Sequence, residues 1–416
     1  MNYFINQYKS SANHKFQTIN LPSSKSESNR LLILSALCEE DFEIHNLSEA
    51  RDTQTLTRLL LQQQTNKTFD VLDAGTAMRF LTAYLAVSTH RPVILTGTER
   101  MQQRPIGTLV NALRLIGAEI NYLKKEDYPP MEIKPFQVQK SGQITVPGNI
   151  SSQYISALLM IAPTLPSGLK IDIQPPVYSI PYIEMTIQLM EKAGIKVERN
   201  GYALTIVPQK YNAIIHEVES DWSAASYWFS FIALSQLQSE ISLKGLLKDS
   251  FQGDQAIVDI MKQLGVTTQF THEGALVKKA SKPLSNHLTL DFKKCPDLAQ
   301  TVLTCCAALK VDLEITGLES LRIKETDRIA ALQIELRKFN CDLIETNEAQ
   351  WSLKSAGFQT KDKIEINTYE DHRMAMSFAP LALMTNLAIQ DIEVVNKSYP
   401  GFWKDLESVG MQLSKK

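Results

Sequence analysis

Residues 21–38 read LPSSKSESNRLLILSALC, a polar and basic cluster that leads directly into an apolar helix. Five later stretches repeat this design: DAGTAMRFLTAYLA (73–86), SSQYISALLMIA (151–162), DWSAASYWFSFIAL (221–234), DLAQTVLTCCAAL (297–309) and EDHRMAMSFAPLAL (370–383). Small and apolar residues dominate each run, as is typical of helices buried on nearly all sides. The sequence therefore predicts six related helices, each with a polar start.

A second, amphipathic helix and a strand follow most of these stretches. Examples are LVNALRLIGAEINYL (109–123), IQLMEKAGIKVER (187–199), IVDIMKQLGVTTQF (257–270) and IAALQIELRKFNCDLIE (329–345). Gly117, Gly194 and Gly265 suit the left-handed position that ends a helix, and Asn340 is the usual substitute. Short β-rich stretches lie between the helices. The pattern predicts a β-α-β-α-β-β repeat that occurs about six times.

The repeats divide the chain into two similar lobes. We predict an α/β fold with residues 20–218 in one lobe and residues 1–19 plus 219–416 in the other, each with three repeats. The break falls just before DWSAAS, where the first three repeats end. A two-domain α/β protein without internal symmetry is the alternative that the pattern leaves open.

Composition excludes several classes of protein. The 416 residues are 44% hydrophobic and 21% charged, which is the profile of a soluble globular protein. The net charge of -2 argues against general nucleic-acid affinity, so a local cluster must hold any anionic partner. The start lacks the pattern of a secretory signal, and the longest apolar runs are too short for the roughly 20 residues that span a bilayer.

The five cysteines form no C-x-x-C pair. Their odd number and their apolar surroundings argue against a disulfide framework or a zinc site. We interpret them as small buried residues in a reducing cytoplasm.

The polar helix starts are candidate anion sites. A helix N-terminus exposes unpaired N–H groups and a partial positive charge, so Ser, Lys and Arg placed there favour anion binding. For residues 21–30 alone, a capped helix with solvated charges is an equally good interpretation. Six such starts, from two lobes that face each other, could enclose a multiply anionic substrate.

The first lobe offers several donors. Lys25, Ser26 and Arg30 lie in SSKSESNR, where Arg presents a planar fork for phosphate and Lys a movable point charge. Gly75 allows a ligand to approach the backbone closely. Arg104 precedes a helix in RPIGTL, although a helix-start proline also explains this motif. No P-loop or G-x-G-x-x-G fingerprint supports ATP or NAD binding.

The second lobe holds the densest cluster, LRIKETDR at 321–328. Lys324 and Arg328 are four residues apart and are predicted to share one helical face beside Glu325, although a solvated charged helix is a serious alternative. Asp371, His372 and Arg373 lie at the mouth of a buried helix, where anion binding is favoured over a metal because HExxH is absent.

Two acids lie among these cations. Asp297 opens the fifth apolar helix, either as a plain N-cap or as a base. Together with Glu325 it is surrounded in the sequence by six cations at helix starts, namely Lys25, Arg30, Arg104, Lys324, Arg328 and Arg373. The set indicates a site for two anionic small molecules, with carboxylates available for proton transfer.

The motifs KSESNR, AGTAMR, RPI, SSQY, PDLA, LRIKETDR and EDHRMAM occur in the order found in the 3-phosphoshikimate 1-carboxyvinyltransferase (EPSP synthase) family. The resemblance spans residues 21 to about 406. It implies an inverse α/β barrel-like fold with two lobes, whose helix N-termini face the cleft between them. It also implies transfer of the enolpyruvyl group of phosphoenolpyruvate to the 5-hydroxyl of shikimate 3-phosphate, on the route to chorismate and aromatic amino acids.

The resemblance further implies a cytoplasmic monomer that needs no cofactor and no metal and has no nucleic-acid or membrane partner. The residues that it assigns to shikimate 3-phosphate are Lys25, Ser26, Arg30, Ser151, Ser152, Gln153, Ser179, Tyr182, Asp297 and Lys324. Those that it assigns to phosphoenolpyruvate are Lys25, Gly75, Arg104, Gln153, Arg328, Arg373 and Lys397. Asp297 is the implied base and Glu325 the implied acid, with Lys25 as a third catalytic residue.

Four positions depart from the usual family pattern. Asp73 stands in place of Asn, Phe80 in place of Pro, Ile180 in place of Lys and Ser320 in place of Asn. The first two flank Gly75 and bear on the shape and charge of the phosphoenolpyruvate pocket.

Two other functions fit part of this pattern. The UDP-N-acetylglucosamine enolpyruvyl transferases share the fold and the donor, but they carry a cysteine in a mobile loop, and the corresponding residues 99–106 here read ERMQQRPI. A non-catalytic anion-binding homologue is expected to have lost Asp297, Glu325 or several cations, and all of these are present.

Overall fold

The computed structural model describes residues 2–9 and 11–415. The chain forms two compact units, and each is described separately. Unit 1 comprises Met1–Pro22 and Glu219–Lys416, and unit 2 comprises Ser23–Val218. The sequence-based boundary at residues 19 and 20 lies three residues before the first of these divisions, and the second division falls at the predicted residue.

Unit 2 contains two complete β-α-β-α-β-β repeats. The first consists of β4 (Thr68–Asp70), α3 (Gly75–Ser88), β5 (Val93–Thr96), α4 (Gly107–Ile116), β6 (Ile120–Tyr122) and β7 (Met131–Ile133). The second consists of β8 (Gln143–Pro147), α5 (Ser152–Ile161), β9 (Leu169–Gln174), α6 (Ile180–Lys192), β10 (Glu198–Asn200) and β11 (Ala203–Ile206). In both, the first two strands are parallel and the last two form an antiparallel hairpin, giving the orders β4-β5-β7-β6 and β8-β9-β11-β10.

The remaining part of unit 2 is a shortened repeat. It consists of α1 (Lys25–Leu37), β3 (Glu43–His45), α2 (Arg51–Leu61) and β12 (Ile215–Glu217), and β3 pairs in parallel with β12. Among the described residues this is the one sheet with only two strands, beside five with four. The prediction of six complete repeats is therefore wrong for this repeat. Only residues 62–67 separate α2 from β4, and this segment is too short for a further hairpin.

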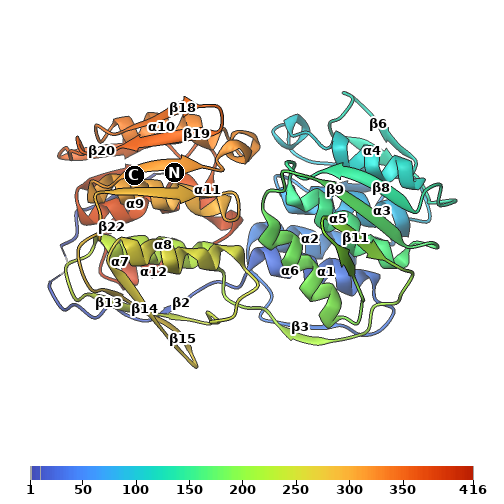
Figure 1. The fold of residues 1–416 in the computed structure, drawn as a ribbon, viewed down its shortest axis with the longest axis horizontal. Helices are drawn as coiled ribbons and strands as arrows, with labels where there is room; N and C mark the ends of the chain where they lie inside the picture. The colour runs from blue at the N-terminus through green and yellow to red at the C-terminus, as the bar shows by residue number, and fades with distance from the viewer. Residues whose placement is uncertain (1, 10, 416) are drawn as a thin grey trace. The chain divides into compact units, whose positions relative to one another are not determined.

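Unit 1 contains three complete repeats, and their helices α7 to α12 are labelled in Figure 1. One has β2 (Ile19–Asn20), α7 (Trp222–Leu234), β13 (Glu240–Lys244), α8 (Ile257–Gln263), β14 (Val266–Thr271) and β15 (Gly274–Lys279). The next has β16 (His287–Asp291), α9 (Ala299–Leu309), β17 (Asp312–Thr316), α10 (Arg328–Arg337), β18 (Asp342–Asn347) and β19 (Gln350–Lys354). The last has β20 (Lys363–Ile366), α11 (His372–Phe378), β21 (Asn386–Ile389), α12 (Phe402–Ser408), β22 (Leu413–Lys415) and β1 (Tyr3–Ile5).

Two strands are exchanged where the chain passes between the units. Strand β2 leads into α1 of unit 2 but pairs in parallel with β13 of unit 1. Strand β12 leads into α7 of unit 1 but pairs in parallel with β3 of unit 2. Each unit therefore receives the first strand of one repeat from a distant part of the sequence.

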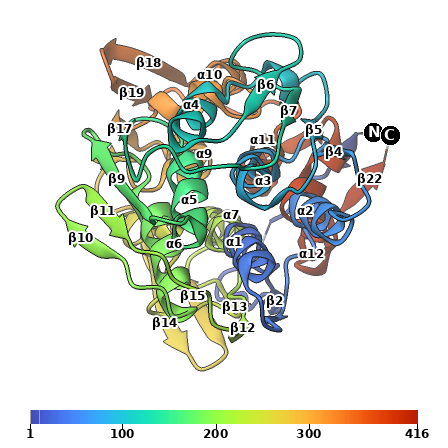
Figure 2. The same ribbon diagram turned by 90° about the vertical axis from the view of Figure 1, so that its right-hand side faces the viewer.

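The apolar stretches form the inner helices of each unit, and the sheets lie outside them. Figure 2 shows α1, α3 and α5 of unit 2 inside the sheets formed by β4–β7 and β8–β11. In α3 every residue from Gly75 to Ala86 is buried, as predicted from its composition. The corresponding inner helices of unit 1 are α7, α9 and α11, and all three are similarly buried. Because the sides of these helices are buried, only their ends are available to contact a ligand.

Glycine and asparagine end the second helices as predicted. Gly117, Gly194, Gly265 and Asn340 all have positive φ, at 127°, 85°, 84° and 58°. In this region only glycine, and occasionally asparagine, escapes a steric cost. Four of the five cysteines are buried, but Cys38 is partly exposed at the end of α1, which corrects the expectation that all five are buried.

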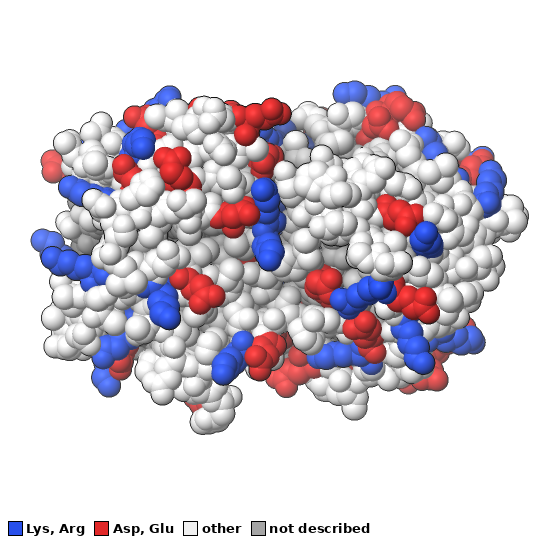
Figure 3. Space-filling model, viewed as in Figure 1, with Lys and Arg blue, Asp and Glu red and all other residues white. Residues whose placement is uncertain are grey.

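The surface carries charges of both signs. On the face shown in Figure 3, Lys and Arg side chains are interspersed with Asp and Glu, and neither sign forms a continuous patch. No helix among the described residues is long and apolar enough to cross a membrane.

Candidate active site

In unit 2, the polar residues that precede or begin the inner helices form local clusters. Lys25 is the first residue of α1, and its Nζ lies 3.7 Å from Asp52 Oδ2 in α2. Ser24 caps this helix by accepting a hydrogen bond from the Glu27 N–H. The lysine is thus held at a helix start, where the unpaired N–H groups reinforce its attraction for anions.

Arg30 lies one turn further along α1 and is 2% exposed. Its Nε donates to Thr186 Oγ1 at 2.7 Å and its Nη1 donates to the Ser26 carbonyl at 2.9 Å. Its Nη2 donates to Ser156 Oγ and to the Tyr182 carbonyl, both at 3.1 Å. Burial lowers the pKa of this guanidinium to about 10. Arg30 therefore fixes Ser26 and Tyr182 relative to each other, and one N–H of Nη1 has no hydrogen bond within this set.

Gly75 and Arg104 are in close contact at the start of α3. A Cβ placed on Gly75 would lie 2.7 Å from Arg104 Nη1, which is closer than carbon and nitrogen can approach without a shift. The absence of a side chain at Gly75 therefore allows the guanidinium to lie against the helix N-terminus. This is the close approach to the backbone that the sequence predicted for Gly75, but in this structure it is made by a side chain of the protein.

The serine-rich start of α5 lies beside the start of α3. Gln153 Nε2 donates to Thr76 Oγ1 at 3.0 Å, which joins the first turns of the two helices. Ser151 is the N-cap residue of α5, and its side chain makes no capping hydrogen bond. Ser179 precedes α6 in a left-handed conformation with φ of 55°. These hydroxyls lie at helix starts, where they can contact a polar ligand.

In unit 1, Arg328 is the centre of an ion network. It is 1% exposed. Its Nε lies 2.6 Å from Asp371 Oδ2, its Nη1 lies 3.0 Å from Asp297 Oδ1, and its Nη2 lies 2.9 Å from Glu325 Oε2. The two acids predicted for proton transfer, Asp297 and Glu325, are therefore held on the same guanidinium.

Asp297 contacts three cations. Arg373 Nη2 lies 3.0 Å from its Oδ2, while Arg328 Nη1 and Lys324 Nζ lie 3.0 Å and 3.7 Å from its Oδ1. Burial alone would raise the pKa of this carboxyl, but Arg373, Lys324 and Arg328 together hold it well below its usual range. In this state Asp297 is fully ionised and is a weak base.

Arg373 has partners that the sequence did not indicate. Its Nη1 donates to Tyr227 Oη at 3.4 Å and its Nη2 donates to Ser223 Oγ at 3.3 Å. Both partners belong to α7, whose polar start was among the candidate anion sites, although no individual residue of this helix was singled out from the sequence. Lys397, which the motif analysis missed and the family resemblance supplied, is the last residue of the 3₁₀ turn Ile392–Lys397 and is 3% exposed.

Two local predictions are wrong. Lys324 and Arg328 do not share a helical face, because α10 begins at Arg328 after the N-cap residue Asp327, and Lys324 directly follows the preceding 3₁₀ turn, Glu319–Ile323. The Asp327 side chain accepts hydrogen bonds from the Ile329 and Ala330 N–H groups, which explains why the helix begins there. Asp297 is not an N-cap either, since it lies within the 3₁₀ turn Pro296–Leu298 that precedes α9.

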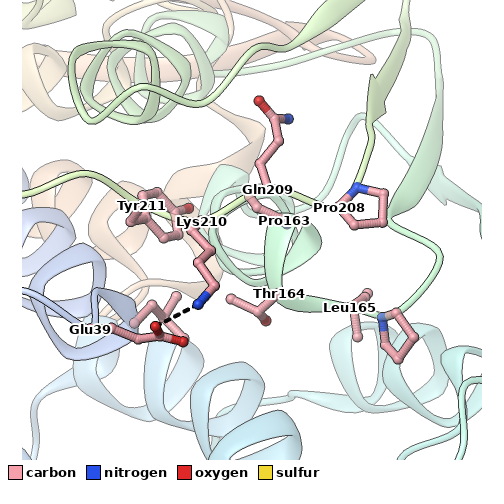
Figure 4. A pocket seen from close by; sticks show the side chains of 10 residues that line it. Glu39, Pro163, Thr164, Leu165, Pro208, Gln209, Lys210 and Tyr211 are labelled. Carbon is pink, nitrogen blue, oxygen red and sulfur yellow. Dashed lines mark hydrogen bonds and ion pairs between the residues drawn. The ribbon is translucent and has the colours of Figure 1, made fainter.

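A pocket of about 410 Å³ in unit 2 lies away from these clusters. It is lined by residues that include Leu37, Pro163 and Tyr211, and Figure 4 shows Lys210 paired with Glu39 at 2.7 Å. Leu37 ends α1 and Pro163 follows the end of α5, whereas the predicted site residues lie at the starts of these helices. At 1.5 Å per residue, the two ends of α1 are about 18 Å apart. The pocket is therefore separate from the candidate active site.

Comparison with known proteins identifies the family. The sequence matches the family model of EPSP synthase (3-phosphoshikimate 1-carboxyvinyltransferase) over residues 16–68 and 57–406. The chain belongs to the EPSP synthase family. A relative from Bacteroides fragilis (strain YCH46), named 3-phosphoshikimate 1-carboxyvinyltransferase, is 47% identical over 398 residues, which cover 95% of this chain and 96% of the relative. A relative of the same name from Mannheimia haemolytica is 33% identical, over 95% of this chain and 96% of its own length.

The structural comparison agrees with this family. The structure of an EPSP synthase from Acinetobacter baumannii superimposes with a TM-score of 0.80 at 20% sequence identity, and the match covers 100% of both chains. At this identity the likeness shows the fold alone, and it confirms the predicted α/β fold class.

Two departures from the usual EPSP synthase pattern have local structural explanations. Asp73 pairs with Arg51, whose Nη2 lies 2.6 Å from Asp73 Oδ2, so its negative charge is offset by a neighbouring cation. Phe80 is fully buried, and the Arg30 guanidinium carbon lies 5.5 Å from the centre of its ring. The aromatic ring thus adds a cation–π contact to the four hydrogen bonds that hold Arg30.

Proposed function

We propose that this protein transfers the enolpyruvyl group of phosphoenolpyruvate to the 5-hydroxyl of shikimate 3-phosphate and releases phosphate, as a cytoplasmic monomer of the route to chorismate. Family membership supports this reaction. The observation that carries the mechanism is the arrangement of Asp297 and Glu325 on one buried arginine, Arg328, at 3.0 Å and 2.9 Å. A base and an acid held side by side can serve the two proton transfers that the reaction requires.

In the first step Asp297 accepts a proton and Glu325 donates one. Asp297 accepts the proton of the 5-hydroxyl, and the oxygen attacks C2 of phosphoenolpyruvate. The electron pair of the C2–C3 double bond takes a proton from Glu325 at C3, which gives a tetrahedral adduct. In the second step C3 returns a proton to Glu325, the double bond forms again, and the C2–O bond to phosphate breaks, with the departing phosphate taking the proton held by Asp297. No oxidant, cofactor or metal is needed for this balance of atoms and electrons.

Binding of the anionic substrate is proposed to activate Asp297. In the unliganded protein Arg373 and Arg328 neutralise this carboxylate and lower its pKa. When the carboxylate and phosphate of phosphoenolpyruvate engage the same two arginines, Asp297 loses part of this stabilisation and becomes a stronger base. The base is thus weak until the electrophile is bound, which limits unproductive proton transfer.

The remaining residues are proposed to bind the substrates. Shikimate 3-phosphate is bound through hydrogen bonds and ion pairs with Lys25, Ser26, Arg30, Ser151, Ser152, Gln153, Ser179, Tyr182, Asp297 and Lys324. Phosphoenolpyruvate is bound in the same way by Lys25, Gly75, Arg104, Gln153, Arg328, Arg373 and Lys397. Arg30 would use the remaining N–H of its Nη1, and its main effect is to hold Ser26 and Tyr182 in place.

The reaction can be tested by phosphate release from purified protein. We expect release with phosphoenolpyruvate and shikimate 3-phosphate, and none when UDP-N-acetylglucosamine replaces the shikimate acceptor. Release with the nucleotide sugar alone would overturn the proposed acceptor. Release with neither acceptor would contradict the proposed catalysis and favour a non-catalytic anion-binding role.

Replacing Gly75 by Ala is expected to raise the KM for phosphoenolpyruvate about tenfold, with little effect on the KM for shikimate 3-phosphate. The new Cβ would lie 2.7 Å from Arg104 Nη1, so the guanidinium must move from its place at the helix start. Loss of one charged hydrogen bond is worth about a factor of ten in affinity. Because Arg104 is a flexible side chain, the free energy of unfolding should change by only about 0.5 kcal/mol.

Gly142→Ala is the matched control for this variant. It lies in the same unit, and the nearest atom to its new Cβ is Ser167 Cβ at 3.9 Å, an ordinary contact. Steady-state kinetics on both variants give the comparison. Equal values of the phosphoenolpyruvate KM in the two variants would contradict the role given to Arg104.

A further inference from the structure

A buried carboxylate, Asp254, lies next to Ser223, which is a hydrogen-bond partner of Arg373. Asp254 belongs to the 3₁₀ turn Gly253–Ala256 and is 2% exposed. Its Oδ2 accepts a hydrogen bond from the Ser223 hydroxyl. The same hydroxyl oxygen accepts a hydrogen bond from Arg373 Nη2 at 3.3 Å. The three side chains form a relay that ends at the nitrogen that also contacts Asp297.

The Ser223 hydroxyl has only one orientation that satisfies both neighbours. A hydroxyl carries one proton and two acceptor lone pairs, and a guanidinium can only donate. With its proton on Asp254, Ser223 presents lone pairs to Arg373. Without the carboxylate, the hydroxyl proton can turn toward other acceptors, and this contact with Arg373 weakens.

Burial of Asp254 is expected to lower the stability of the fold. Its Oδ1 is buried and has no hydrogen-bond partner among the described residues. Burial first, and then the charge of Asp297, raise the pKa of Asp254 to about 7, against the opposing effect of Arg373. The charge of Asp221 also raises the pKa of Asp254, and the charge of Asp254 raises the pKa of the Cys295 thiol. An incompletely paired carboxylate costs stability, and such groups persist where they serve a function.

We propose that Asp254 is a positioning residue for Arg373 and acts through the Ser223 hydroxyl. This inference rests on the proposed function, in which Arg373 binds phosphoenolpyruvate. Arg373 is held by Ser223 and Tyr227 on α7 and by the Asp297 carboxylate. Phosphoenolpyruvate binding weakens the contact with Asp297, so the relay from Asp254 keeps Nη2 in place when that contact is lost.

The test is a double-mutant cycle of Asp254→Ala and Ser223→Ala, with alanine at position 254 because an asparagine oxygen would still accept the Ser223 proton. Each single variant is expected to raise the KM for phosphoenolpyruvate about tenfold, with kcat and the KM for shikimate 3-phosphate within about twofold of wild type. The double variant should equal the single variants, because both changes break one relay. A merely structural role would alter both KM values and kcat together.

Asp405→Ala is the matched control. Asp405 is another partly buried carboxylate of unit 1, accepts a hydrogen bond from Tyr399 Oη at 2.7 Å, and has no part in the site. Its phosphoenolpyruvate KM should not change.

Each of the other outcomes overturns the relay. An unchanged phosphoenolpyruvate KM in either single variant would do so, and additive effects in the double variant would show that the two residues act separately. If Asp254→Ala does not fold, Ser223→Ala alone decides, because it removes the hydroxyl while Asp254 and Arg373 stay. Wild-type protein without phosphate release would instead overturn the proposed function, and the inference with it.

Discussion

Glu325→Gln is expected to lower kcat by about 10²–10⁴-fold while shikimate 3-phosphate binding stays close to the wild-type value. General acid–base catalysis by one side chain contributes a factor of this size, and an amide cannot supply the proton that C3 needs. The amide oxygen of Gln can still accept the hydrogen bond from Arg328 Nη2, which is 2.9 Å long in the wild type. The local structure should therefore survive the change. Phosphate release gives kcat, and calorimetry gives the affinity for shikimate 3-phosphate.

The control for this variant is Glu345→Gln. Glu345 lies on β18 in the same unit and also pairs with an arginine, Arg322 Nη2, at 2.9 Å, but its side chain is exposed. It should retain wild-type kcat. Loss of shikimate 3-phosphate binding in Glu325→Gln, with or without loss of turnover, would count against the acid role.

Arg328→Met is expected to lower the free energy of unfolding of unit 1 by about 3–5 kcal/mol. Removing one partner of a buried ion network leaves the other charges without compensation, and this costs more than the net strength of the network. Here the guanidinium is 1% exposed and Asp371, one of its three carboxylate partners, is fully buried. All four tryptophans, at positions 222, 228, 351 and 403, belong to unit 1. Urea unfolding followed by tryptophan fluorescence therefore reports on this unit.

Two further variants make the stability result specific. Arg337→Met changes an exposed arginine of the same helix, whose Nε lies 3.3 Å from Asp342 Oδ1, and should stay within about 0.5 kcal/mol of wild type. Asp371→Asn, added to Arg328→Met, removes the buried charge but keeps an N-cap side chain for α11, so it should restore part of the loss. Equal losses in Arg328→Met and Arg337→Met would contradict the network's contribution.

Much of the fold can be predicted from the sequence because its signals are local. The apolar runs that form α3, α7 and α9 are long and distinctive, and the residues that end the second helices need a backbone conformation that few residues adopt. The shortened first repeat was missed, because the pattern of α1 and α2 continues the series and only the short segment 62–67 reveals the missing hairpin.

The site was predictable in its residue types but not in its pairing. Lys25, Asp297, Glu325 and Arg373 could be selected because charged residues at apolar helices are unusual. Which carboxylate meets which cation depends on contacts between residues far apart in the sequence, such as Arg328 with Asp371. Nothing in the sequence distinguishes Asp254 from a solvated loop residue, because it is a single acid in a polar turn. Its burial becomes visible only in the structure.

The position of β1 has a consequence for how the chain is made. This strand, Tyr3–Ile5, lies between β21 and β22, so it pairs with two strands that are synthesised much later. Unit 2 has all its strands once residue 217 has emerged from the ribosome, whereas the sheet of β1 is complete only after β22, Leu413–Lys415, has emerged. Translation therefore delivers a complete unit 2 while the N-terminal strand still has open edges, which are prone to pair with other chains. A truncation that removes β22 would leave one of those edges open permanently.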